Sequence, residues 1–200
     1  TATMRRSNAE AAETRRTIVR TASRLFREKG IRGIGVADLM QRAGLTHGGF
    51  YKHFRSKDAL VAEACASGLE QTRRSLTEAV AHAPAGHGLR RILEAYLSPA
   101  HRDAPETGCT IAALGGEAAR ADHAAREALT GGVEDLIALV AEQLDEPDPE
   151  RRRRTAAAIV SAMVGGLLVS RAVADTGLSD EVLRDTRRFL LERLDPADGG

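Results

Sequence analysis

The residues whose side chains are best suited to binding chemistry lie between positions 46 and 57, where an aromatic and basic run follows two adjacent glycines. The sequence there is THGGFYKHFRSK, with Gly48 and Gly49 directly before Phe50 and Tyr51. Each glycine costs a helix interior about 1 kcal/mol relative to alanine, so a helix with both needs a compensating reason. The hydroxyl, ammonium and imidazole groups that follow are donors suited to phosphate oxygens. We therefore expect this stretch to contact a polyanion.

The charge distribution supports the same interpretation. Residues 1–55 carry 12 Lys and Arg against 4 Asp and Glu, whereas residues 56–200 carry 17 against 24, although the whole chain has a formal charge of only +1. A basic amino-terminal quarter on an otherwise acidic chain is typical of a local module that binds a polyanion. Charge alone leaves a solvated helix face open as the alternative.

The elements that must position these residues are predicted to be helices. Apolar residues make up 42% of the chain but aromatic residues only 3%, and apolar positions recur at helical spacing, which indicates an all-α protein. Ile18, Ala22, Leu25 and Phe26, for example, form one stripe. The expected helices are 9–29, 36–43, 46–54, 56–80, 89–99, 109–120, 122–144, 150–175 and 179–194, with loops at 81–88 and 101–108.

Glycines and small polar residues predict where the first helices end and begin. Gly30 and Gly44 are placed to end helices, Thr46 to cap the third helix, and Ser56 to cap the fourth. Two short helices joined by a tight turn containing glycine are the signature of a helix-turn-helix. In that motif the second helix enters the major groove of DNA through its amino-terminal end.

The two glycines have two explanations at this level. Without side chains at positions 48 and 49, the backbone of the second helix approaches the phosphates closely. Alternatively, the glycines let this helix pack against its neighbours in the same chain. In either case Phe50 and Phe54, four residues apart, are expected to face the core.

At these residues the chain resembles a known family. VADLMQRAGLTHGGFYKHFRSKDAL closely resembles the DNA-binding domain of tetracycline-repressor (TetR) family bacterial regulators, and the resemblance covers roughly residues 13–62. It implies an all-α homodimer with an N-terminal three-helix helix-turn-helix DNA-binding domain and a C-terminal helical ligand-binding and dimerisation domain. We expect these domains to span residues 9–55 and 56–196.

The resemblance also implies which residues line the DNA, a palindromic double-stranded operator. Tyr51, His53 and Lys57 fit the family's phosphate contacts, and positions 46–48 are expected to read the base sequence. Arg15 is either a further backbone or minor-groove contact or a solvated charge. The full expected set is Thr46, His47, Gly48, Tyr51, Lys52, His53 and Lys57.

The last two predicted helices are candidates for the dimer interface. Residues 155–175 are apolar over most of the helix circumference, so this helix must be buried on more than one side. Gly165 and Gly166 permit close approach of another helix. The resemblance implies a four-helix bundle with the symmetry mate, and burial inside the monomer remains the alternative.

A small-molecule inducer is expected to bind in a cavity among the helices between about residues 89 and 175. Glu117 needs either solvent or a polar partner there. Cys109 lies near a predicted helix start, where the helix dipole favours a reactive thiolate, so an electrophile or redox sensor is one alternative and a small buried hydrophobe is the other. The candidate lining residues, each of which also fits plain core, are Tyr96, Cys109, Leu114, Glu117, Leu136, Met163 and Leu167.

Other function classes lack sequence support. The six histidines show no HExxH motif, and there is no P-loop, GxSxG or Gly-rich dinucleotide turn, so we expect no catalytic residues, no metal and no cofactor. No run of eighteen uninterrupted apolar residues predicts a membrane span, and no apolar stretch follows the first basic residues as in a signal peptide. With only two cysteines, a cytoplasmic protein with reduced thiols is expected. A ligand-independent DNA-binding protein is the remaining alternative, and the acidic carboxy-terminal part argues against it.

Overall fold

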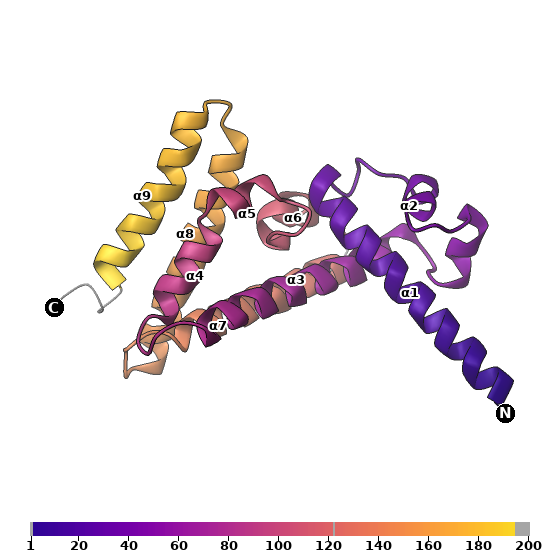
Figure 1. The fold of residues 1–200 in the computed structure, drawn as a ribbon, viewed down its shortest axis with the longest axis horizontal. Coiled ribbons are helices and arrows are strands. Elements are labelled where there is room, and N and C mark those ends of the chain that lie inside the picture. The colour runs from indigo at the N-terminus through magenta and orange to yellow at the C-terminus, as the bar shows by residue number, and fades with distance from the viewer. Residues whose placement is uncertain (1, 122, 195–200) are drawn as a thin grey trace.

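The computed structural model describes residues 2–121 and 123–194, and the side chains of residues 8–121 and 123–192. All regular structure in these ranges is helical, which confirms the predicted fold class (Figure 1). The elements are α1 (Ala2–Lys29), α2 (Val36–Arg42), the 3₁₀ helix η1 (His47–Lys52), α3 (Lys57–Ala81), α4 (Gly88–Tyr96), α5 (Pro99–Asp103), α6 (Thr110–Ala118), α7 (His123–Ala141), α8 (Pro149–Ala172) and α9 (Thr176–Leu194).

The amino-terminal unit consists of α1, α2 and η1, packed on the first half of α3. The predicted stripe of α1 is buried, with Ile18, Ala22 and Phe26 each 0% exposed. α1 ends directly before Gly30, and α2 ends two residues before Gly44. The φ values of these glycines, 79° and 73°, lie in the left-handed region that glycine adopts without strain. The glycine stop signals are therefore confirmed.

Helix α3 belongs to two hydrophobic clusters. Its residues Leu60, Val61 and Ala64 join the amino-terminal cluster, whereas Leu76 joins the larger carboxy-terminal cluster. The Ser56 side chain accepts a hydrogen bond from the Ala59 N–H at 3.1 Å, as predicted for a helix cap. Because α3 serves both clusters and lies along α7 (Figure 1), a boundary between residues 55 and 56 stays a prediction.

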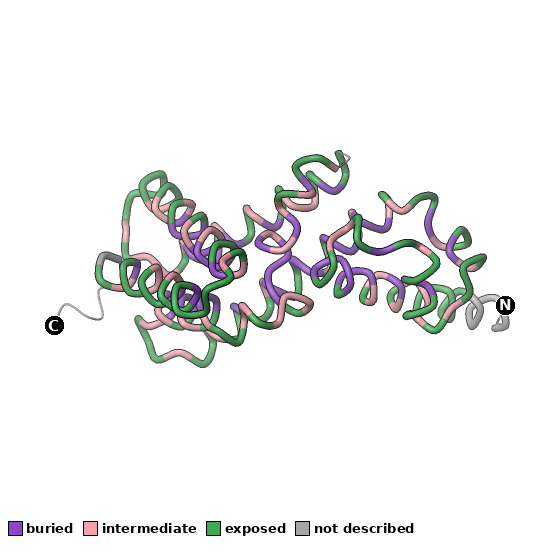
Figure 2. Tube along the Cα trace, turned by 90° about the horizontal axis from the view of Figure 1, so that it is seen from above, coloured by how far each residue is buried: buried purple, intermediate pink, exposed green. Residues whose placement is uncertain are grey.

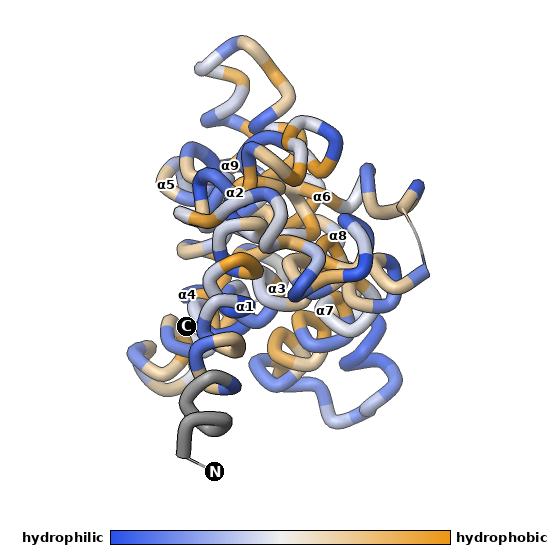
Figure 3. The backbone as a smooth tube through the Cα atoms, turned by 90° about the vertical axis from the view of Figure 1, so that its right-hand side faces the viewer, coloured by the Kyte–Doolittle hydropathy of each residue, from blue (hydrophilic) through white to orange (hydrophobic). Residues whose placement is uncertain are grey.

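The carboxy-terminal cluster is formed by α4, α7, α8 and α9 together with the end of α3. Burial is greatest where these helices face one another (Figure 2), and hydrophobic segments gather at the same places, with hydrophilic ones toward the outside (Figure 3). Most of the buried side chains of this core are aliphatic, such as Ile159 and Leu97, which are 1% and 0% exposed. The aromatic Tyr96, 1% exposed, lies among them. The few aromatic residues in the sequence predicted this kind of core.

Three local expectations need correction, and a fourth is not tested. The first helix begins at Ala2 rather than at residue 9, because no stop signal precedes that position. The third helix is a 3₁₀ helix, and the Thr46 side chain makes no capping hydrogen bond. The predicted loop 101–108 begins inside a short helix, α5, which Ser98 caps by accepting from the His101 N–H at 3.2 Å and which has Pro99 in its first turn. The segment 195–200, where we expected a frayed end, lies outside the described residues.

Among the described residues, α8 is the one helix long and apolar enough to cross a membrane by length and composition. In the structure its residues Ile159, Met163 and Leu167 belong to the carboxy-terminal core, and α8 packs against α7 and α9. The same length and composition are common in core helices of soluble proteins, and the packing of α8 fits that description.

Candidate DNA-binding interface and sensor cavity

The 3₁₀ helix η1 has one buried and one exposed face, as the sequence predicted. Phe50 and Phe54 are 1% and 3% exposed, and their rings stack with centroids 5.6 Å apart. Tyr51 is 68% exposed. The other exposed residues of the predicted DNA-contact set are Thr46, His47, Gly48 and Lys52.

The structure separates the two explanations of the paired glycines. A Cβ atom at position 48 would meet no other atom within 4 Å, and one at position 49 would make only ordinary contacts, 3.6 Å from Thr46 Oγ1 and 3.8 Å from Met40 Cε. Neither glycine is among the residues with positive φ. Packing inside the chain therefore does not require glycine at position 48, and close approach of the backbone to DNA stays a prediction there.

Arg15 and His53 form an internal link beside η1. The Arg15 guanidinium donates to the His53 carbonyl oxygen, pairs with the Glu63 carboxylate and lies 4.1 Å from the centroid of the Phe54 ring. These contacts give Arg15 a structural role that ties α1 to η1 and α3, so it is not simply a solvated charge, and a DNA contact by Arg15 stays a prediction. The His53 side chain is half-buried and stays a predicted phosphate contact.

Lys57 is already engaged within the chain. Its Nζ donates to the carbonyl oxygens of Ile31 and Ile34, each at 2.6 Å, and lies 5.9 Å from the centroid of the Phe26 ring. The ammonium therefore supports the loop between α1 and α2. Lysine has three N–H donors, so a phosphate contact through the third stays a prediction.

A cavity of about 280 Å³ lies between α3, α4 and the segment from α5 to α6. Of the seven candidate lining residues, Tyr96 and Cys109 line it, whereas the other five do not: Leu114, Glu117, Leu136, Met163 and Leu167. The polar residues that line it are Thr72, Ser75, Ser98, Tyr96, His101, Thr107 and Cys109.

The Tyr96 hydroxyl is the most unusual group in this cavity. Tyr96 is 1% exposed, and its hydroxyl finds no hydrogen-bond partner in the described part of the chain. Burial raises the pKa of Tyr96 well above its ordinary value, and the neighbouring Cys109 raises it further. A buried hydroxyl without a partner is costly, so a polar group of a bound molecule would find a ready partner here.

His101 fixes the wall of the cavity, and sequence analysis gave it no role. Its Nδ1 lies 2.7 Å from the Tyr96 carbonyl oxygen, and its Nε2 accepts a hydrogen bond from the Cys109 N–H at 2.9 Å. This pattern assigns the neutral ring with the proton on Nδ1. Burial lowers the pKa of His101, and Arg171 and Arg27 lower it further. The cap made by Ser98 three residues earlier is the local signal that could have placed His101.

Glu117 points away from the cavity, toward the amino-terminal unit. Its carboxylate accepts hydrogen bonds from the Ile31 N–H at 3.1 Å and the Arg32 N–H at 3.3 Å. The polar partner that this carboxylate needed is therefore the loop between α1 and α2, not solvent or a ligand. The expectation that Glu117 lines the cavity is corrected accordingly.

The remaining cavity candidates are core residues. Met163 and Leu167 are 1% and 0% exposed and belong to the carboxy-terminal cluster, as does Leu136. Leu114 belongs to the amino-terminal cluster. Their placement agrees with the plain-core alternative.

The comparisons with known proteins account for both halves of the molecule. Residues 18–64 match the family model described as bacterial regulatory proteins, tetR family. Residues 85–185, half of the chain, match the C-terminal domain of LmrA/YxaF-like transcriptional regulators. The chain belongs to the TetR family. This is a family of helix-turn-helix transcriptional regulators and not of enzymes.

Individual relatives of this TetR-family chain agree with the assignment. It is 38% identical over 76 residues to the HTH-type transcriptional regulator TtgR of Pseudomonas putida, an alignment that covers 38% of this chain and 36% of TtgR. The matched region thus spans about a third of that relative's length. The chain is 27% identical over 136 residues to the HTH-type transcriptional repressor NemR of Escherichia coli, covering 66% of this chain and 68% of NemR. The crystal structure of reduced E. coli NemR has the same fold, with a TM-score of 0.75 at 22% identity over 92% of this chain and 99% of NemR.

Proposed function

We propose that this chain is a ligand-responsive transcriptional repressor that binds a palindromic operator as a homodimer and is released by a small-molecule inducer. The observation that supports it most directly is the exposed face of η1, where a side chain at position 48 would have free space but glycine occurs. The proposal also places the protein in the cytoplasm of a bacterium, where operator DNA is found.

In the proposed complex with DNA, the η1 helix of each protomer enters the major groove. Half-sites of a two-fold operator lie roughly 34–36 Å apart, one turn of DNA, so two copies are needed. Thr46, His47 and Gly48 stand at the start of η1, where base edges are read, and Tyr51 and Lys52 reach the flanking phosphates. Close approach of the backbone at Gly48 compensates for the helix propensity that glycine lacks.

The dimer is proposed to form through α8 and α9. Large hydrophobic side chains are exposed on these helices, with Leu168 at 52%, Val169 at 46% and Phe189 at 53%. A Cβ atom at Gly165 would meet nothing within 4 Å, so a helix of the second copy can approach there. By contrast, Gly166 already packs against Thr186 and Leu97 inside the protomer. Burial inside the monomer thus applies to one side of α8, and pairing with the second copy is proposed for the other side.

The sensor is proposed to be the cavity at Tyr96. Helix α6 starts beside this cavity at Cys109 and carries Glu117 near its other end, where the carboxylate holds the α1–α2 loop. An inducer that fits the cavity better when α6 is displaced would therefore shift the population toward a state with wrongly spaced η1 elements. The shift is limited to the inducer's difference in affinity between the two states.

The proposal is tested with DNA from the region that flanks the protein's own coding sequence. We expect a gel-shift titration to find a fragment that contains an inverted repeat and is bound by the dimer. Compounds that release the protein from this fragment should lose affinity when Tyr96 is changed to Phe, because the hydroxyl is then missing. If compounds that occupy the cavity do not weaken operator binding, the ligand-independent alternative is favoured.

A second candidate for the sensor is covalent, because the Cys109 thiol lines the same cavity. In a conjugate addition the sulfur would form a bond to the β-carbon of an unsaturated carbonyl compound. The carbon–carbon π pair moves to the α-carbon, which receives the proton that the thiol loses. Alkylation of Cys109 with no change in operator affinity would exclude this candidate.

A further inference from the structure

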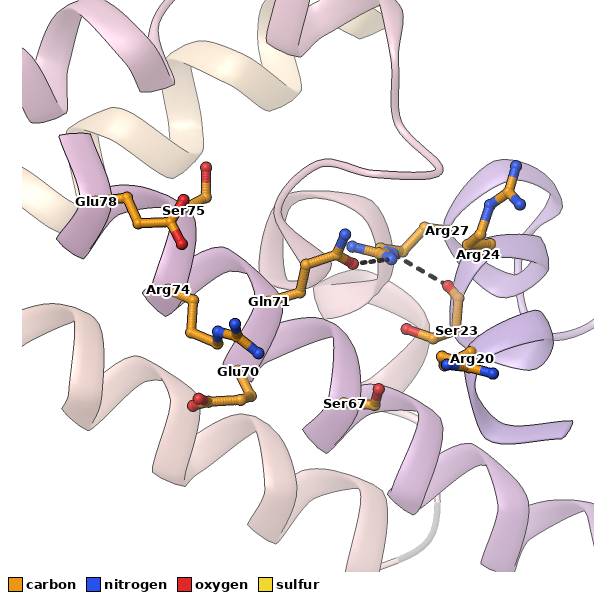
Figure 4. Close-up of a pocket in the computed structure, with 10 residues that line it drawn as sticks. All are labelled: Arg20, Ser23, Arg24, Arg27, Ser67, Glu70, Gln71, Arg74, Ser75 and Glu78. Carbon is orange, nitrogen blue, oxygen red and sulfur yellow. Dashed lines mark hydrogen bonds between the residues drawn. The ribbon is translucent and has the colours of Figure 1, made fainter. Parts of the chain in front are cut away.

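A second and larger cleft lies outside the sensor cavity, between α1 and α3 (Figure 4). Its volume is about 540 Å³, and every residue that lines it is of a polar or charged type: four arginines, three serines, two glutamates and one glutamine. Pockets of 300–1,000 Å³ are typical of small-molecule sites, but those are mostly apolar. The lining of this cleft therefore suits a charged molecule rather than an apolar one.

Arg27 is a buried cation in this cleft whose hydrogen bonds all go to neutral groups. It is 4% exposed and donates to the Ser23 carbonyl at 3.1 Å, the Gly108 carbonyl at 2.7 Å and Gln71 Oε1 at 2.9 Å. Burial disfavours the charged form of the guanidinium and therefore lowers the pKa of Arg27. Buried charges are normally paired, and no carboxylate of the described residues contacts this guanidinium, so its positive charge lacks a counter-anion.

Ser23 provides an independent observation one helical turn before Arg27. It lines the cleft and is 4% exposed, yet its hydroxyl oxygen finds no hydrogen-bond partner among the described side chains and backbone. Most buried hydroxyl groups in folded proteins are satisfied by protein or water. This hydroxyl and the Arg27 side chain belong to the same wall of the cleft, on α1 (Figure 4).

The other charged residues of the cleft leave an excess of positive charge. In the described structure, Arg24 and Arg74 form no ion pair, and Arg20 donates to Glu13 and to Thr17 Oγ1, each at 3.3 Å. Both carboxylate oxygens of Glu70 are taken by Arg73, each at 2.8 Å. Only Glu78 brings an uncompensated negative charge to the lining.

We propose that the cleft between α1 and α3 binds a small molecule through a phosphate or carboxylate group, with Ser23 and Arg27 at its floor and Arg24 and Arg74 at its rim. Guanidinium groups bind such oxyanions with two parallel N–H donors, and the free hydroxyl adds a third donor. Because Ser23 and Arg27 are more than nine-tenths buried, the backbone of a DNA duplex cannot reach them, so the occupant is a small molecule. The proposal does not depend on operator binding or on the sensor cavity.

The test is titration calorimetry of the full chain with inorganic phosphate and with citrate, at constant ionic strength set with sodium chloride. We expect saturable binding of at least one of the two anions and an increase in the melting temperature with its concentration. Binding of phosphate alone or of citrate alone identifies which oxyanion the cleft prefers. Absence of saturable binding by both anions would overturn the proposal.

Three variants locate the binding. Ser23→Ala removes a hydroxyl that has no partner, so the melting temperature without anion should stay the same, while anion affinity should fall about tenfold. Arg74→Gln should lower affinity by a similar factor through loss of a rim charge. Arg153→Gln, which changes an exposed arginine on α8, is the matched control and should bind like wild type. If Ser23→Ala and Arg74→Gln both bind like the control, the anion is not in this cleft and the proposal is wrong.

Discussion

At the scale of single residues, Gly48 and Gly132 have opposite surroundings. A Cβ atom at Gly132 would lie 2.8 Å from Leu69 Cγ, so that glycine is required where α7 packs on α3. A Cβ atom at Gly48 would meet nothing within 4 Å. The fold thus requires glycine at position 132 but not at position 48, where the proposed approach of DNA supplies the reason.

This difference predicts opposite effects of the same substitution. Gly48→Ala should leave the free energy of unfolding unchanged or raise it by up to about 1 kcal/mol, because alanine is the better helix former. Gly132→Ala should lower it by about 1–3 kcal/mol, because the core must move to admit the methyl group. Chemical unfolding of both variants measures this. A loss of stability in Gly48→Ala as large as in Gly132→Ala would mean that position 48 packs inside the chain.

His101 predicts a pH dependence of stability. Its pKa is lowered in the folded chain, mainly by burial, whereas the unfolded chain has the ordinary value of about 6.5. Between these two pKa values the unfolded state therefore binds more protons than the folded state. The stability that the neutral His101 ring contributes is present above about pH 6.5 and is lost as the pH falls through the lowered folded pKa. Protonation of Nε2 also removes the acceptor of the Cys109 N–H.

The melting temperature should consequently decrease less between pH 7.5 and 5.5 in His101→Gln than in wild type. His123→Gln, at an exposed histidine on α7, is the matched control and should keep the wild-type dependence. If His101→Gln follows wild type over this range, burial of the neutral ring is not what makes stability depend on pH.

At the scale of elements, α6 joins the proposed sensor cavity to the amino-terminal unit through Glu117. The loop after α1 is held from two sides, by the Glu117 carboxylate at the N–H groups of Ile31 and Arg32 and by Lys57 at two carbonyl oxygens. Any displacement of α6 therefore changes the support of this loop.

Glu117→Ala should make the amides of Ile31 and Arg32 exchange with solvent about tenfold faster, because each loses its acceptor. Hydrogen-exchange mass spectrometry resolves this loop. Glu134→Ala, at an exposed glutamate on α7, should leave the loop unchanged. Equal exchange in the two variants would show that Glu117 does not support the loop.

Local signals predicted the elements well, and long-range contacts escaped prediction. Gly30, Gly44 and Ser56 act within a few residues of their own position, so the sequence shows their effect directly. The partners of Arg15 and Glu117 lie 38 and 86 residues away, and no sequence period reports such pairs. The sequence therefore indicated that these charges matter without indicating what they contact.

At the scale of the whole molecule, the account requires two copies. The exposed hydrophobic residues of α8 and α9 are the surface available for this, and by two-fold symmetry each substitution there acts twice. Leu168→Glu should weaken dimerisation about 100-fold or more. Sedimentation velocity measures it, with Ala124→Glu on the exposed side of α7 as the control. If the Leu168→Glu variant is still dimeric at the protein concentrations at which the wild-type protein is dimeric, the interface lies elsewhere.

The central claim is that the exposed face of η1 docks into DNA, and selection of binding sites from a random duplex library tests it most directly. The account predicts that the wild-type protein enriches an inverted repeat with half-sites one helical turn apart. It also predicts that Gly48→Val, folded and dimeric, enriches none, because its side chain holds the backbone away from the phosphates. Enrichment of the same repeat by Gly48→Val, or of no repeat by the wild-type protein, would contradict the account.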